Sequence, residues 1–174
     1  MKECAMKKIL RTLMITCLFV ILLGTSVYAN GSNPYLAPVY TQSELLPDHI
    51  KSSKVRETSK LRGEYFGVAE LEIINENGKI GVSARAYMKK PVDEVNMLIY
   101  LDQLNEKGQW VQVANYSFDF YAKDYPDGLL TPGTDFIVTD QPSGYYYRLR
   151  GQYLAFLDGG MEGFGPVTDG VFIE

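Results

Sequence analysis

The feature that most constrains this chain is an alternation of apolar and polar residues, which begins near Leu61 and recurs through the rest of the sequence. Successive side chains of a β-strand point to opposite faces, so a period of two residues predicts strands. Asn77-Gly78 separates two alternating runs, and this pair is typical of a type I′ turn because both central residues need positive φ. The sequence therefore predicts a hairpin. Its expected facing pairs are Ile73 with Val82, Leu71 with Ala84, Glu70 with Arg85, Glu72 with Ser83, and Glu76 with Lys79.

Further apolar or alternating runs follow at similar spacing, with turn residues between them. They are residues 95–104, 109–120, 135–139, 145–157 and 167–173. Trp110 opens one run after a glycine turn, so we expect it within the core or at its edge, where large aromatic side chains contribute most burial. About seven short strands predict an all-β fold, an antiparallel β-sandwich over residues 61–174 that we expect to be immunoglobulin-like.

Residues 1–29 have the pattern of a secretory signal peptide. A basic stretch precedes an apolar run, 12–23, which is shorter than the roughly 20 residues of a membrane-spanning helix. Small residues end at Ala29, so we expect cleavage between Ala29 and Asn30, with an uncleaved anchor as the alternative. Residues 30–60 contain three prolines and no sustained periodicity, which predicts a flexible linker or tail. The expected protein is secreted and extracellular, without a membrane span after signal removal.

Charge and residue types exclude several activities. Removing residues 1–29 takes away four basic residues and one acidic residue, which leaves 13 basic and 20 acidic residues and a net charge of −7. An acidic surface repels nucleic-acid phosphates and anionic lipid, so we expect no nucleic-acid partner. Cys4 and Cys17 lie in the signal segment and the single histidine, His49, lies in the expected linker. We therefore expect no disulfide, no metal, no cofactor, no catalytic residue and no enzymatic activity.

Carboxylates near two expected loops allow three interpretations. They are Asp119, Asp124, Asp127 and Asp135 around the first loop, and Asp158, Glu162 and Asp169 around the second. A carboxylate pair can hydrolyse glycosides, and oxygen ligands suit calcium. However, the spacing of Asp124 and Asp127 lacks the alternating ligands of a calcium loop, and aspartate is an ordinary turn residue. Turn formation is therefore favoured over calcium binding and catalysis.

The most unusual segment is a tyrosine-rich and arginine-rich run at the start of residues 145–157. Alternation divides it into a core-facing set, Tyr145, Tyr147 and Leu149, and an outward set, Tyr146, Arg148 and Arg150. We call the outward set the Tyr–Arg row and expect it to face solvent. Tyrosine and arginine often carry binding energy, so the row is the candidate binding site. The alternative is that acidic residues on neighbouring strands pair with both arginines.

Three motifs carry a resemblance to a known family. They are Gly108-Gln109-Trp110, Ser143-Gly144-Tyr145-Tyr146-Tyr147-Arg148-Leu149-Arg150-Gly151 and Thr168-Asp169-Gly170-Val171. Across residues 61–174 the chain resembles a family of small secreted proteins of unknown function from Gram-positive, largely clostridial, bacteria. The resemblance implies secretion and a β-sandwich, and it supplies no catalytic residue. The tyrosine-rich run also looks like the strand of immunoglobulin-like sandwiches in which a tyrosine pins a corner.

The first functional hypothesis is a secreted, non-enzymatic binding or interaction module for an extracellular protein or glycan. One alternative is an extracellular glycan hydrolase that uses a carboxylate pair. A second alternative is a secreted bacteriocin-like effector. The sequence does not identify the ligand.

Overall fold

The structure, a computed structural model, describes residues 42–58 and 63–174. The described residues form nine strands and one short 3-10 turn, Ala122–Asp124. The strands are β1 (Ser52–Thr58), β2 (Phe66–Glu76), β3 (Lys79–Met88), β4 (Glu94–Leu104), β5 (Trp110–Tyr121), β6 (Gly133–Val138), β7 (Tyr145–Leu157), β8 (Gly160–Phe164) and β9 (Val171–Ile173). The expected signal peptide and its cleavage site between Ala29 and Asn30 lie outside this description. Within the described residues, no helix has the length and hydrophobicity needed to cross a membrane.

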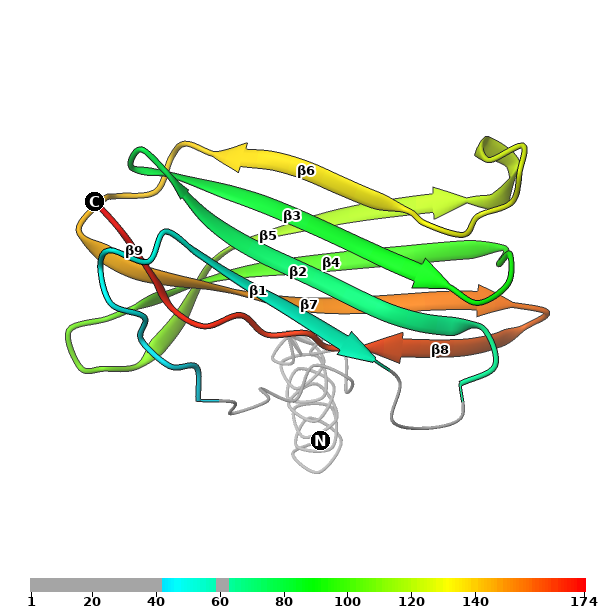
Figure 1. The fold of residues 1–174 in the computed structure, drawn as a ribbon, viewed down its shortest axis with the longest axis horizontal. Coiled ribbons are helices and arrows are strands. Elements are labelled where there is room, and N and C mark those ends of the chain that lie inside the picture. Colours follow the sequence, from blue (N-terminus) through cyan, green and yellow to red (C-terminus); the bar gives the residue numbers. More distant parts are fainter. Residues whose placement is uncertain (1–41, 59–62) are drawn as a thin grey trace, which may run out of the picture. The chain divides into compact units, whose positions relative to one another are not determined.

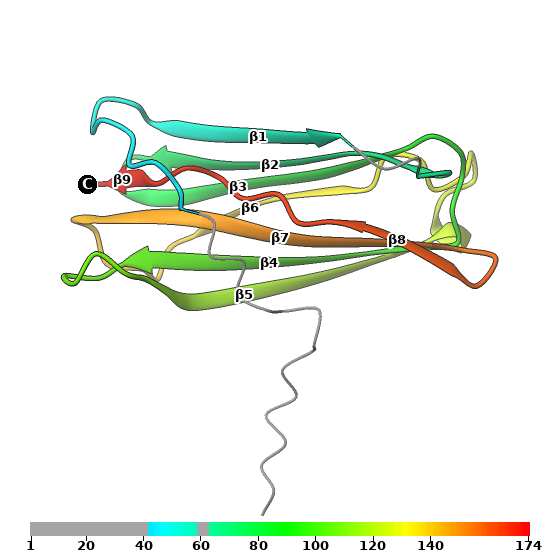
Figure 2. The same ribbon diagram turned by 90° about the horizontal axis from the view of Figure 1, so that it is seen from below.

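The strands form two antiparallel sheets, which confirms the predicted β-sandwich (Figure 1). One sheet has the order β1-β2-β3-β6, and the other has the order β5-β4-β7-β8 with β9 also paired to β7. Figure 2 shows the two sheets as separate layers packed face to face. Buried side chains from both layers fill the space between them, among them Leu71, Ile73, Val82, Met97, Ile99, Leu149 and Tyr153.

The strand order does not confirm the immunoglobulin-like comparison. In an immunoglobulin domain of the constant type the third strand lies in the opposite sheet from the first two, which gives the orders ABED and CFG. Here β2 and β3 are joined by a hairpin within one sheet, and β4 and β5 are paired with each other in the second sheet. The structure therefore supports a β-sandwich and leaves the immunoglobulin-like comparison unconfirmed.

The predicted hairpin between β2 and β3 is confirmed in its register. Glu70 lies opposite Arg85, and the other expected pairs also face each other. Asn77 and Gly78 have φ values of 54° and 83°, as a type I′ turn requires. The agreement arises because the turn chemistry and the alternation on both strands favour the same register.

Replacing Gly78 with alanine is expected to destabilise the protein by more than the same change at Gly108. Both glycines have positive φ, 83° and 71°, so both changes carry the conformational penalty of about 1–2 kcal/mol. A Cβ atom at position 78 would also lie 2.6 Å from the Glu174 carbonyl oxygen, whereas one at position 108 meets nothing within 4 Å. Urea unfolding of both variants measures the difference. Equal losses would contradict the close contact at the C-terminus.

The expectation of a flexible linker is wrong for Ser52–Thr58, which forms β1. β1 is an edge strand, and its backbone hydrogen bonds come from β2, about fifteen residues further along the chain. Its charged side chains, Lys54 and Arg56, also find their partner on β2, in Glu70. Because little of β1 is apolar, its own sequence shows no buried face and no strand signal.

A second strand missing from the prediction is β8, in a segment expected to be a glycine-rich loop. It follows a tight turn in which Asp158 and Gly159 have φ values of 51° and 77°. Asp-Gly is a type I′ turn signal of the same kind as Asn77-Gly78. The signal was therefore present in the sequence, but the glycines after it obscured the alternation of β8.

Candidate functional site

The Tyr–Arg row lies on the face of β7 that points away from the other sheet. Tyr147 and Leu149, from the expected core-facing set, are fully buried between the sheets, so this part of the division is confirmed. Tyr145 is not part of the core, because it stands at the beginning of β7 and is 39% exposed. Tyr146, Arg148 and Arg150 alternate with the buried residues as predicted.

The row does not face solvent, because a buried carboxylate on β4 binds both arginines. Asp102 is 2% exposed and lies opposite Arg148, which is 5% exposed. The Asp102 Oδ2 atom accepts hydrogen bonds from Arg148 Nε at 3.0 Å and from Arg150 Nε at 2.6 Å. Arg150 Nη2 also donates to Asp102 Oδ1 at 3.0 Å. The expected solvent exposure is therefore wrong for the arginines, and Asp102 is the acidic neighbour that the alternative interpretation required.

Aromatic rings pack against both guanidinium groups. The Arg148 guanidinium lies 4.6 Å from the ring centre of Trp110, and the Arg150 guanidinium lies 5.0 Å from that of Tyr100. Trp110 is thus on the outer face of its sheet and is not part of the core, contrary to the prediction. Its ring approaches Gly170, where an added Cβ atom would lie 2.9 Å from Trp110 Cη2. Arg148 therefore stacks on Trp110, and the ring edge of Trp110 lies close to Gly170.

The polar atoms of the row also bind the chain segment before β1. The Tyr146 hydroxyl lies 2.7 Å from Asp48 Oδ1 and 3.1 Å from the Leu46 carbonyl oxygen. Arg148 Nη1 donates to Ser43 Oγ at 3.0 Å. These contacts hold residues 43–48 beside β9, where Leu46 N donates to the Gly170 carbonyl oxygen. The residues that bind the polar atoms of the row therefore belong to the same chain.

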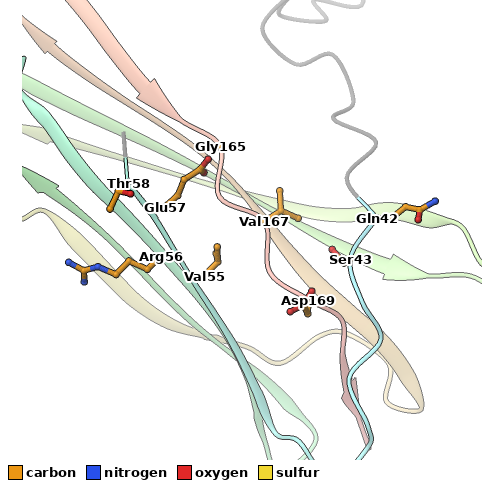
Figure 3. Close-up of a pocket in the computed structure, with 9 residues that line it drawn as sticks. All are labelled: Gln42, Ser43, Val55, Arg56, Glu57, Thr58, Gly165, Val167 and Asp169. Carbon is orange, nitrogen blue, oxygen red and sulfur yellow. The ribbon is translucent and has the colours of Figure 1, made fainter. Parts of the chain in front are cut away.

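A groove of about 400 Å³ lies between β1 and the run 165–169, which connects β8 to β9 (Figure 3). Val55 and Glu57 of β1 line one side, and Val167 and Asp169 line the other. Glu57 points from β1 toward the run 165–169, and Asp169 points from the opposite side toward β1 (Figure 3). At one end the Asp169 backbone N–H donates to Ser53 Oγ at 3.0 Å. The groove combines apolar surface with two carboxylates. Arg56 also lines it, but its side chain points away from the run 165–169 (Figure 3) and pairs with Glu70.

Three of the carboxylates that the sequence singled out bind structural partners. Asp135 pairs with Arg85 at 2.5 Å, and Asp119 accepts a hydrogen bond from Asn96 at 2.9 Å. Glu162 accepts backbone hydrogen bonds from Glu64, Tyr65 and Phe66 at 2.6, 3.3 and 2.8 Å. Over residues 42–58 and 63–174, no three histidine, cysteine, aspartate or glutamate side chains are grouped as metal ligands would be. Asp169 alone among the predicted carboxylates lines the groove.

The Glu162 carboxylate is expected to make the protein's stability sensitive to acid. Burial raises the pKa of Glu162, but the N–H donors of Phe66, Glu64 and Tyr65 together with the charge of Lys89 lower it by more, so the pKa lies below its usual value. A carboxyl group with a depressed pKa contributes stability above its unfolded pKa of about 4.3, and this contribution is lost as the pH falls toward the lower folded value. Glu162→Gln should therefore lower stability at neutral pH and flatten its decline in acid. Urea midpoints measured between about pH 7 and pH 3 check this, with Glu106→Gln at an exposed turn as control. Parallel profiles for Glu162→Gln and the unmodified protein would contradict it.

Sequence reasoning missed Asp102, Val55, Glu57 and Val167. Asp102 had a detectable signal, since it is a charged residue near the end of an otherwise apolar run. The groove residues had none, because the groove exists only where β1 and the run 165–169 meet, more than a hundred residues apart in the chain.

The comparisons with known proteins give no assignment, since no protein-family model and no curated protein matches the chain.

Proposed function

We propose that this protein is a secreted, non-enzymatic binding module that uses the groove beside β1 to hold an extracellular protein or glycan. One observation carries the proposal: the groove adjoins a sheet edge that has no further strand beside it within the described residues. Such an edge presents unpaired backbone groups, which a partner can satisfy. The Tyr–Arg row is the weaker candidate, because its polar atoms already bind Asp102 and residues 43–48.

Secretion belongs to the proposal and rests on the signal-peptide pattern of residues 1–29 and on the family resemblance. The exported protein is expected to begin at Asn30, because small residues suited to cleavage end at Ala29. Intact-mass measurement of the protein in culture medium checks this. A cell-bound species that retains Met1 would contradict it.

A binding screen tests the groove as the site. The purified protein is applied to arrays of extracellular glycans, peptides and bacterial cell surfaces, together with the variant Val167→Trp, which fills the groove. Val111→Trp is the matched control, because Val111 is an exposed residue of β5 outside the groove. The proposal predicts saturable binding that Val167→Trp abolishes and Val111→Trp retains, with both variants showing a native circular dichroism spectrum. The absence of any saturable ligand, or equal binding by both variants, would overturn it.

The glycan hydrolase is the second candidate, and one observation favours it: Glu57 and Asp169 line the same groove. Hydrolysis requires two carboxyl groups on either side of the scissile bond. Incubation with extracellular polysaccharides, followed by an assay for new reducing ends, tests the activity. A hydrolase would release product, and Glu57→Gln and Asp169→Asn would each abolish release. Binding without release supports the non-enzymatic module.

A further inference from the structure

We propose that the groove binds an extended, basic polypeptide segment, which adds to the free edge of β1 as a further strand. This inference rests on the proposed function, since it names the partner of the same groove. It commits to a peptide ligand and to backbone pairing as the mode of binding. Strand addition of this kind obtains its affinity from main-chain hydrogen bonds and its specificity from alternate side chains.

The free edge of β1 presents four residues whose backbone groups point outward. The Asn75 N–H donates to the Lys51 carbonyl oxygen at 2.6 Å. In an antiparallel pair every second residue directs its N–H and C=O toward the partner strand, and the residues between direct theirs away. Counting from Lys51, the residues of β1 that point away from β2 are Ser52, Lys54, Arg56 and Thr58, and the last three lie nearest the groove residues Val55 and Glu57. Among the described strands, β1 pairs only with β2, so these groups have no ladder partner.

The side chains beside this edge define the ligand's chemistry. A strand added to β1 would direct alternate side chains into the groove, next to Val55 and Glu57 and opposite Val167 and Asp169. Within residues 42–58 and 63–174, neither Glu57 nor Asp169 forms a salt bridge. Two such carboxylates favour lysine or arginine among the inward side chains, and the two valines favour an apolar residue between them.

A second copy of the chain fits this edge poorly. If two β1 strands paired antiparallel about Val55, Lys54 of one copy would lie opposite Arg56 of the other. If they paired about Arg56, that residue would lie opposite its own copy. Like charges directly opposite each other destabilise a strand pair, and basic residues on an edge strand commonly protect against self-association. The edge is therefore suited to a different chain, whose basic residues lie on the groove side.

A designed peptide tests the inference. The probe is a capped nonapeptide in which threonine alternates with lysine and valine, so that an extended strand carries lysine and valine on one face only. Calorimetry is expected to show saturable binding, and hydrogen exchange is expected to slow at the amides of Lys54, Arg56 and Thr58. Exchanging lysine for glutamate in the probe should remove measurable binding. In an extended strand the N–H groups of the lysine and valine residues lie along one edge, and those of the threonines lie along the other. N-methylation of the set that faces β1 should abolish binding. N-methylation of the other set should leave binding intact.

Variants of the protein locate the peptide. Glu57→Gln should weaken binding about fivefold, and less so at high salt, because it removes one partly exposed charge interaction. The matched control Glu106→Gln, at the exposed turn between β4 and β5, should leave affinity unchanged. Undiminished binding by Glu57→Gln, or no protection of the three amides, would overturn the inference. If the peptide fails but a glycan binds and Val167→Trp blocks it, only this inference fails; if nothing binds, the proposed function fails as well.

Discussion

Asp102→Asn is expected to lower the free energy of unfolding by about 3–5 kcal/mol, the usual cost of removing one member of a buried ion pair. Asp102 is 2% exposed and is the only carboxylate among the described residues that pairs with Arg148 or Arg150. Its removal takes from the buried Arg148 guanidinium the carboxylate that it pairs with, whereas Arg150, with 21% of its side chain exposed, can turn toward water. Chemical denaturation measures the loss.

A second change separates the charge effect from other consequences of the substitution. Arg148→Met in the Asp102→Asn background should recover part of the stability, because apolar residues often replace buried ion pairs at little cost. The recovery should be incomplete, since Arg148 also donates to Ser43 and stacks on Trp110. A loss of less than about 1 kcal/mol for Asp102→Asn would show that the arginines do not depend on this carboxylate.

Tyr147→Ala is expected to cost about 3–5 kcal/mol, the range for truncating a large aromatic side chain in a core. Tyr147 has no exposed surface and packs among residues of both sheets. Its hydroxyl donates to the Pro142 carbonyl oxygen at 2.6 Å and accepts a hydrogen bond from Gln103 Nε2 at 2.7 Å. Tyr147→Phe removes only the hydroxyl, so it should cost about 1–3 kcal/mol.

Tyr100→Phe is the matched control for the hydroxyl of Tyr147. The Tyr100 hydroxyl is buried and has no hydrogen-bond partner among the residues that the structure describes. Removing a buried polar group that makes no hydrogen bond relieves a desolvation cost, so this variant should be as stable as the unmodified protein or more stable. Thermal or urea unfolding of the two phenylalanine variants measures both effects. Equal destabilisation by both would contradict the assignment of the Tyr147 hydrogen bonds.

The Tyr147 hydroxyl makes the one contact that the likeness to immunoglobulin-like sandwiches predicted. A tyrosine at the entry to a late strand was expected to pin a corner, and Tyr147 does bind the backbone five residues upstream. This local interaction is therefore present, although the immunoglobulin-like fold as a whole is not confirmed. A tyrosine corner depends on one strand and the turn before it, whereas strand order depends on every connection in the fold.

The Tyr–Arg row was predictable in its alternation but not in its burial. Period two assigned each side chain to the correct face of β7, apart from the exposed Tyr145 at the strand's start. What covers the outer face depends on residues far away in the chain, including Trp110 and residues 43–48. No local sequence pattern encodes such contacts. The row was expected to face solvent, but other segments of the same chain cover it.

The sequence by itself determined the fold class, the Asn77-Gly78 hairpin and its register, because alternation and turn chemistry act within a few residues of each other. Only the tertiary structure decided that Ser52–Thr58 is a strand, since its hydrogen bonds and its charge partner come from β2. It also decided where the groove lies, since Glu57 and Asp169 are brought together by the packing of β1 against the run 165–169. Local interactions are readable along the chain, whereas an edge strand and a groove depend on which distant segments the packed core places side by side.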